Sequence, residues 1–493
     1  MTAGVAPTHA SAPPAEPRPP RPDRAGAKWA ALILAAALTC SVALANRFPL
    51  TYYDSASYLK KAYAFSHAAR PLSLDARDYH RFQPAAGSPF TNPFFYRPPP
   101  YSVFLLPFAS PLAVRAVPFA QGLLAALVVA LALRTAGLDP RPTGLVLLFL
   151  FLSTLTSLPW YTGQIMPDVF TGLVILLAYL TVWTPERLRP GERAAALAML
   201  AFTLSVHLSH LPLYAGLVLT GFAWRRWVDR ARIAGALVLR ALAPLAVAAA
   251  ALVASNVVFG RRLVLSESSS LFYLARLVGD GTAQRYLARA CAARSYVLCS
   301  ERGNLPESSD HFLWDGDGAW TKHQNDPRFL AEAPEIVRGT LREEWGAQLA
   351  ASLRNGFAQL GAFGSDLDLH ASEGQVAPLM ALFGAGTLAA YHASLQARRS
   401  LPLEAAGRVQ RVVVVLSLMV LLACVPRLRA RASGPARALV AVTLAGVTLN
   451  ALVLGALSSV HDRYQGRVIW LVPLMAAALL ARSGIGAPRR GAA

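Results

Sequence analysis

The chain has 493 residues, of which 55% are hydrophobic and 15% are charged, and its mean hydropathy is +0.40. This composition is too apolar for a soluble protein of this size, so it excludes an ordinary soluble enzyme. The net charge of +20 does not indicate nucleic-acid binding, because arginines such as Arg225, Arg226, Arg230 and Arg232 gather in short loops between apolar runs. Such loops orient membrane helices and attract anionic lipid. We therefore predict a polytopic membrane protein with membrane lipid, and no nucleic acid, as its partner.

The chain begins with a segment that cannot form a core. Residues 1–27 are rich in proline, alanine and arginine, which predicts a disordered cytoplasmic tail. The first apolar run, residues 28–45, ends in Ala43-Leu44-Ala45, which resembles a signal-peptidase site. The long basic segment before this run favours an uncleaved membrane anchor with its N-terminus in the cytoplasm.

Ten further apolar runs follow, which makes about eleven predicted membrane helices. They lie at residues 117–133, 144–158, 169–182, 194–206, 211–224, 233–254, 377–391, 412–425, 438–457 and 468–481. Several are shorter than the roughly 20 residues that cross a bilayer, so short, tilted or re-entrant helices are expected. The predicted fold is all-α, with an N-terminal membrane module at 28–256, a C-terminal module at 376–484 and a tail at 485–493. Residues 46–114 form a first external loop with amphipathic helices.

Residues 257–375 form the one large polar segment, predicted as a periplasmic loop with an amphipathic helix at each end. Cys291 and Cys299 lie in it; a periplasmic location would allow a disulfide, and two separate reduced cysteines are the alternative. His311, Trp314 and Trp320 line an acceptor site or form the core of the loop. The sequence leaves both pairs of alternatives open.

Counting from a cytoplasmic N-terminus places the first external loop, the turn at residues 160–168 and the large loop outside. Strict alternation then places residues 426–437 outside and residues 461–467 inside. The four arginines between positions 427 and 437 favour the reverse. One of the last apolar runs is therefore expected to be re-entrant or split.

The polar stretch at residues 46–107 stands out against the apolar background. It holds an acid, Asp54, among tyrosines that include Tyr53 and Tyr58, and a cation, Arg97, followed by three prolines and Tyr101. Charged groups at a membrane are costly to place and are often functional. The simpler interpretation is that a loop after a membrane helix needs charges to stay hydrated.

Three more segments carry candidate residues. Asp168 ends a short turn that contains Trp160 and Tyr161, and Arg463-Tyr464 precede the last apolar run. His207 and His210 lie three residues apart at a helix end. With no third ligand evident, they favour a packed or substrate-facing role over a metal site, so no metal or other cofactor is assigned and the metal requirement stays open.

These residue types together fit one chemistry. Two acids in one outer cleft can act as a general base and as a group that orients the acceptor. A guanidinium binds phosphate through two hydrogen bonds and stabilises a phosphate leaving group, and aromatic rings pack on sugar faces. The implied reaction is transfer of a sugar from a lipid phosphate to an acceptor outside the cytoplasm.

The arrangement resembles the GT-C superfamily of polyprenyl-phosphate-dependent glycosyltransferases, and is similar to the protein O-mannosyltransferases and the lipid A aminoarabinose transferases. Those enzymes carry an acid in the first external loop, as Asp54 here, and a basic residue before Pro-Pro and an aromatic, as Arg97-Pro98-Pro99-Pro100-Tyr101 here. Many have a second acid in the next external turn and an Arg-Tyr pair before the last run. The chain departs in its single acid before Ser55 and in Gln465-Gly466-Arg467, which replace the usual proline.

The resemblance implies a multi-pass enzyme of the bacterial inner membrane with its active site facing the periplasm. Asp54 would be the general base and Asp168 the orienting acid, while Arg97, Arg463 and Tyr464 would bind the donor phosphate. Sugar or acceptor contacts would come from Tyr53, Tyr58, Tyr101, Trp160, Tyr161, His207 and His210. The partners would be a polyprenyl-phosphate sugar and an extracytoplasmic glycan, lipid or protein, with inversion at the anomeric carbon. The alternative is a transporter, flippase or non-catalytic assembly protein for lipid-linked saccharides.

Overall fold

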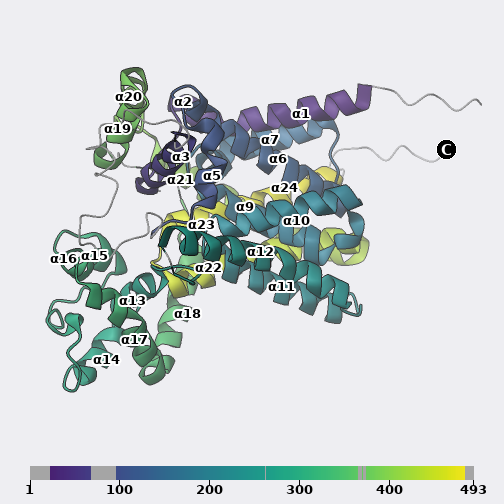
Figure 1. Ribbon diagram of the computed structural model, residues 1–493. Helices are drawn as coiled ribbons and strands as arrows, with labels where there is room; N and C mark the ends of the chain where they lie inside the picture. Colours follow the sequence, from purple (N-terminus) through teal and green to yellow (C-terminus); the bar gives the residue numbers. More distant parts are fainter. Residues whose placement is uncertain (1–22, 68–95, 261, 365–368, 370–372, 484–493) are drawn as a thin grey trace, which may run out of the picture.

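The computed structural model describes residues 23–67, 96–260, 262–364, 369 and 373–483 (Figure 1). The predicted tails lie outside these residues, apart from positions 23–27, and so does the stretch 68–95 of the predicted first external loop. The described residues form helices and no strand, and one isolated parallel bridge joins Leu50 to Gln164.

Most helices form one bundle, built from near-continuous apolar sequence. They are α1 (Asp23–Thr39), α6 (Val117–Ala136), α7 (Pro142–Leu155), α9 (Phe170–Ala178), α10 (Pro190–Ser205), α11 (His210–Trp227), α12 (Gly235–Gly260), α21 (Leu403–Arg431), α22 (Gly434–Leu457) and α24 (Leu471–Ser483). Among the described residues, five stretches are long and apolar enough to cross a membrane: Ala113–Ala136, Gly235–Val258, Leu403–Leu428, Gly434–Leu457 and Asp462–Ala481. Three shorter apolar helices are Gly26–Thr39, Pro142–Leu155 and Pro167–Trp183. The protein is therefore an α-helical membrane protein.

The bundle has a buried centre and an apolar outside. Every residue of α9 is buried, and α9 packs against α6, α10, α11 and α22. On the outside, α12 exposes Leu239 and Val258, and α21 exposes Val412 and Leu422, each by more than half of its surface. Exposed apolar side chains in such number are normal where lipid replaces water, because lipid imposes no hydration cost on them.

Hydrogen bonds identify the two ends of the bundle. At one end, Ser433 Oγ donates to the carbonyl of Ala136 at 3.2 Å, and Tyr179 OH donates to the carbonyl of Pro435 at 3.1 Å. Arg225, in the last turn of α11, donates to the carbonyl of Trp183 at 3.0 Å. The loops after α6, α9, α11 and α21 therefore lie together, and we call this the arginine end because it carries the arginine-rich loops. The opposite end, here the site end, holds the Leu50–Gln164 bridge and the helices α2 (Ser41–Ala45), α3 (Tyr53–His67), α5 (Pro100–Phe104) and α23 (Asp462–Ile469), on the left in Figure 1.

The predicted membrane span at residues 377–391 is wrong as a single helix. The chain forms α19 (Glu373–Leu382) and α20 (Ala385–His392), separated at Gly384, whose φ of +103° suits glycine and few other residues. α19 packs against α3, and the ring of Phe383 lies 5.6 Å from that of Tyr63. The pair therefore stays at the site end (Figure 1), and the chain returns to the bundle through α21.

Residues 262–361 form a separate helical lobe beside the site end (Figure 1). It contains α13 (Ser269–Gly279), α14 (Thr282–Ala290), α15 (Ser309–Trp314), α16 (Ala319–His323), α17 (Pro327–Glu343) and α18 (Trp345–Gly361). Trp320 is buried in its core with Phe312 and Phe329, whereas Trp314 is exposed. Cys291 and Cys299 are joined as a disulfide, which decides between the two alternatives left by the sequence.

Candidate functional site

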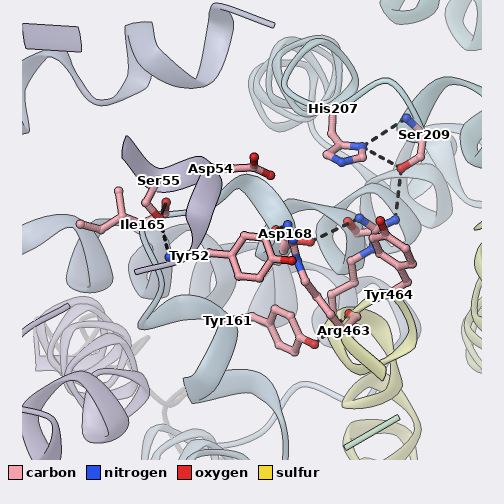
Figure 2. Close-up of polar contacts among 12 residues, drawn as sticks. Tyr52, Asp54, Ser55, Tyr161, Ile165, Asp168, His207, Ser209, Arg463 and Tyr464 are labelled. Atoms are coloured by element: carbon pink, nitrogen blue, oxygen red, sulfur yellow. Dashed lines mark hydrogen bonds and ion pairs between the residues drawn. The ribbon is translucent and has the colours of Figure 1, made fainter. Parts of the chain in front are cut away.

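The first ion pair of the site joins Asp54 to Arg97. Asp54 lies in the first turn of α3, and its Oδ1 is 2.7 Å from Arg97 Nη2. The start of α3 is held in place by Ser55, whose Oγ accepts from the Tyr52 N–H and donates to the carbonyl of Ile165 (Figure 2). Both charged side chains are about one-fifth exposed, at 18% and 22%, so the pair is reachable by a ligand.

Arg97 has a rigid setting. Three prolines follow it and restrict the backbone, and Arg97 Nη1 also donates to the carbonyl of Tyr96 at 2.8 Å. Tyr101 OH donates to Gln121, whose amide donates in turn to the carbonyls of Thr162 and Gln164. Burial acts to lower the pKa of Arg97, and the Asp54 carboxylate outweighs it, so the pKa is raised and the guanidinium stays charged.

The second ion pair is fully buried and involves two arginines. Asp168 precedes α9, and its Oδ2 accepts from Arg463 Nη2 at 2.8 Å while its Oδ1 accepts from Arg467 Nη1 at 3.4 Å. Arg463 and Arg467 are four residues apart on α23 and so share one face. Arg467 also donates to Ser209 Oγ and Asn450 Oδ1. Arg467 had no role among the sequence-based predictions, although its spacing from Arg463 indicates a shared helix face.

Two tyrosines connect the ion pairs. The Cζ of Arg463 lies 3.9 Å from the centroid of the Tyr52 ring, a cation–π contact. The Tyr58 side chain is fully buried, and its hydroxyl has no hydrogen-bond partner among the described residues. Burial raises the pKa of Tyr58, and Arg97, Asp54, Asp168 and Arg463 all act on it electrostatically. Tyr58 is therefore within electrostatic reach of both ion pairs.

The two histidines differ in their surroundings. His210 Nδ1 lies 2.6 Å from the carbonyl oxygen of Thr203, and His210 Nε2 lies 2.8 Å from Thr171 Oγ1. Both ring nitrogens therefore make hydrogen bonds inside the bundle. His207 Nδ1 accepts from the Ser209 N–H, and its side chain is turned toward the region of Asp168 (Figure 2). Burial and then Arg467 lower the pKa of His207. Among the described residues, no three His, Cys, Asp or Glu side chains are grouped to hold a metal ion.

The remaining predicted residues take several positions. Tyr161 OH donates to the carbonyl of Arg463 at 2.8 Å and so helps to fix α23. Tyr464 OH accepts from Ser458 Oγ, and its ring centroid is 5.6 Å from Arg467 Cζ. Trp160 is buried in the bundle core, and Tyr53 is 43% exposed on α3. Tyr53 is thus exposed and His207 is partly exposed, while Trp160, Tyr161 and His210 are buried in the bundle.

A shallow pocket opens beside Arg97, with about 290 Å³ of empty space that includes open solvent. Its wall contains residues from the first loop, the α10–α11 turn and the end of α12 with the segment after it: Tyr96, Arg97, Pro98, Pro99, Leu208, Leu252, Asn256, Leu265, Ser266 and Glu267. The sequence did not predict Ser266 and Glu267, because polar residues after a membrane helix are common.

Comparisons with models of known protein families, with curated proteins and with solved structures give no match. The geometry of the site is therefore the basis on which function is inferred.

Proposed function

We propose that this protein is an integral membrane glycosyltransferase of the GT-C type, which moves a sugar from a polyprenyl-phosphate donor to an acceptor outside the cytoplasm. The observation that carries the proposal is the Asp54–Arg97 pair, which is partly exposed and stands beside a pocket at one end of an apolar bundle. A carboxylate and a guanidinium in such a setting can act as general base and phosphate ligand.

The charge distribution supports the orientation. Arg141, Arg189, Arg230 and Arg437 are among the many arginines of the loops at the arginine end, and such loops face the cytoplasm. We infer ten crossings, made by α1, α6, α7, α9, α10, α11, α12, α21, α22 and α24. With α19 and α20 excluded, alternation agrees with the arginines of residues 427–437. The site end then faces the periplasm of a bacterial inner membrane.

The proposed reaction is a single displacement. The donor phosphate binds Arg97 and competes with Asp54 for the guanidinium, which releases the carboxylate. Asp54 then takes the proton of an acceptor hydroxyl, and the acceptor oxygen forms a bond to the anomeric carbon. The bond from that carbon to the phosphate oxygen breaks, and polyprenyl phosphate leaves with its negative charge near Arg97. Attack opposite the leaving group inverts the anomeric centre.

Asp168 has a positioning role in this proposal. It is fully buried and paired with two arginines, so it is poorly placed to accept a proton. It holds Arg463 against the Tyr52 ring, next to Asp54. Arg463 thereby adds positive charge near Asp54.

The test uses purified protein in liposomes containing a polyprenyl-phosphate sugar, with release of polyprenyl phosphate as the readout. Asp54→Asn is expected to lower turnover by at least 100-fold, the usual contribution of a general base, while donor binding remains. Arg97→Ala should weaken donor binding strongly, and Arg97→Lys partially, because lysine keeps the charge but loses the planar fork.

Arg115→Ala is the matched control, because Arg115 is an exposed arginine at the same end that contacts the Phe48 ring. It should behave as the wild type. If the wild type instead moved the lipid-linked sugar across the bilayer without releasing polyprenyl phosphate, the protein would be a transporter. If Asp54→Asn and Arg97→Ala both kept wild-type turnover and donor binding, the assignment of Asp54 and Arg97 to the active site would be wrong.

A further inference from the structure

The outer face of α18, the last helix of the lobe, is apolar. It is formed by four large side chains at intervals of four residues, which lie along one face of a helix: Trp345, Leu349, Leu353 and Phe357. Trp345 and Phe357 are exposed by 68% and 67%, and the two leucines by 52% and 45%. The only charged residue in the sequence of α18 is Arg354. A continuous exposed apolar face of this kind marks an interaction surface.

The inner face of α18 is polar. Gln348 and Gln359 are buried. Gln348 Nε2 and Asn355 Nδ2 donate to the two carboxylate oxygens of Asp280, each at 2.8 Å, and Asp280 is paired with Arg276. The helix therefore turns its polar side chains toward the protein and its apolar side chains outward, which is the reverse of a helix that faces water.

The other long helices of the lobe have the ordinary arrangement. α14 buries Leu287 and exposes Arg285 and Arg289. α17 buries Ile336 and exposes Arg338. The inverted pattern therefore belongs to α18 and not to the lobe as a whole, so one side of the lobe is built for water and another side is not.

The contact between α18 and α22 explains which surroundings the apolar face meets (Figure 1). α22 is long and apolar enough to cross a membrane. The two backbones approach closely, since a Cβ on Gly356 would lie 3.2 Å from Leu452 Cα and a side chain on Gly455 would meet the backbone of Gly356. Leu452 and Gly455 belong to the last two turns of α22. Phe357, which follows Gly356, therefore lies beside the apolar span, and Leu457 at the end of that span is exposed as well.

We propose that the outer face of α18 is a membrane-contact surface, which lies among the lipid acyl chains of the leaflet at the site end. Acyl chains impose no hydration cost on the four large apolar side chains, and the protein itself satisfies the polar groups of the inner face. The Trp345 ring suits the membrane–water interface, and the long side chain of Arg354 can reach lipid phosphates. This surface holds the lobe against the bilayer, and the inference does not depend on the proposed function.

The test places a nitroxide on single cysteines of the full chain in liposomes of phosphatidylethanolamine and phosphatidylglycerol. Leu349→Cys, Leu353→Cys and Phe357→Cys probe the outer face of α18. The nitroxide collides with molecular oxygen, which concentrates among acyl chains, and with a polar nickel chelate, which stays in water. At the three positions the ratio of oxygen to nickel collisions should be as high as at Leu422→Cys, an exposed apolar position of the spanning helix α21.

Arg338→Cys, on the exposed side of α17, is the matched control and should give a ratio severalfold lower. A ratio on α18 equal to that of this control would overturn the proposal, because the face would then lie in water. Low collision rates with both reagents would also overturn it, since a second copy of the chain or another protein segment would then cover the face. Should the substitutions disturb folding, the wild type gives a second readout. A diazirine carried on a lipid acyl chain should label residues 345–361 and not α14, and absence of label in residues 345–361 would refute the membrane contact.

Discussion

Asp168 and Asp54 are both paired with arginine, but their burial gives them different energetic roles. Asp168, Arg467 and Arg463 have side chains exposed by 0%, 0% and 8%, so the three charges depend on each other for stabilisation. Removing one partner from a buried group of this kind leaves an uncompensated charge. The Asp54–Arg97 pair is partly exposed, and water can solvate either partner when the other is lost.

We therefore expect Asp168→Asn to destabilise the protein by about 3–5 kcal/mol. Asp54→Asn, the matched change at the exposed pair, should cost about 1 kcal/mol or less. Apparent melting temperatures in one detergent would measure the difference. Equal losses in the two variants would mean that Asp168 is not a structural charge, and its assignment as a positioning residue would be wrong.

Lys61 makes the site sensitive to pH. It lies two turns after Asp54 on α3, and its Nζ donates to Ser57 Oγ at 3.1 Å and to the carbonyl of Arg97 at 3.4 Å. Burial, and then the charge of Arg97, lower the pKa of Lys61 to about 7. Because the ordinary value of 10.5 applies to the unfolded chain, the folded state is penalised while Lys61 is charged. The penalty is full below about pH 7 and falls as the pH rises from there.

Lys61→Met removes this penalty, so its stability relative to the wild type should be highest at pH 6 and should decline between pH 7 and 9. Thermal unfolding at several pH values would measure this trend. Lys60→Met is a control on the same helix, at a position where the pKa is lowered by burial without Arg97. A difference between Lys61→Met and the wild type that does not vary with pH would show that Lys61 is not buried as a charge.

At the residue scale, the sequence identifies charges but not their partners. Asp54, Arg97, Asp168 and Arg463 are conspicuous because acids and arginines are rare in apolar surroundings. Which acid pairs with which arginine depends on segments almost 300 residues apart in the chain, as for Asp168 and Arg463, and no local pattern encodes that. Glu267 lies in a polar segment where charge is unremarkable, so only the pocket draws attention to it.

At the element scale, the apolar run at residues 377–391 shows how hydropathy misleads. The run is apolar enough to resemble a span, but Gly384 breaks it and α19 packs on α3. Composition cannot distinguish a helix that contacts lipid from one that contacts protein. The conflict between alternation and the arginines of residues 427–437 indicates that one of the predicted runs does not cross in the proposed topology, but it does not identify the run.

This topology predicts a labelling pattern for single cysteines introduced at exposed positions. Ser400→Cys, before α21, should react with a membrane-impermeant maleimide added to intact cells. Asp229→Cys and Ala430→Cys, both at the arginine end, should react only after the membrane is opened. The native cysteines should contribute little labelling, because Cys40 and Cys424 are buried and Cys291 is bonded to Cys299. Labelling of Ala430→Cys in intact cells would restore residues 377–391 as a crossing.

At the scale of the whole molecule, the lobe contacts the bundle just before the helix that carries the two arginines. Arg276 Nη1 donates to the carbonyl of Ser458 at 3.0 Å, and Ser309 Oγ is 2.7 Å from Ser459 Oγ. His461 Nε2 is 2.9 Å from Asp310 Oδ2. These contacts fix residues 458–461, and α23 begins at the next residue, so the lobe helps to set where Arg463 and Arg467 lie.

Gln359 of α18 makes the most specific of these contacts. It is fully buried, its Nε2 donates to the carbonyl of His461 at 2.7 Å, and its Oε1 accepts from the His461 N–H at 2.9 Å. Gln359→Leu keeps the volume and removes both hydrogen bonds to His461, each worth about 1 kcal/mol, together with a longer one to the carbonyl of Ala362 at 3.2 Å. Local opening of α23 should then rise roughly 30-fold.

Hydrogen exchange of the full chain would measure this opening in residues 459–467, with α14 as an internal reference. Gln324→Leu is the matched control, because the Gln324 amide donates to Thr321 within the lobe and does not reach the bundle. Exchange in α23 should rise in Gln359→Leu and stay at the wild-type level in Gln324→Leu, with α14 unchanged in both. If exchange in α23 did not respond to Gln359→Leu, the bundle alone would fix the two arginines, and the lobe would have no part in shaping the site.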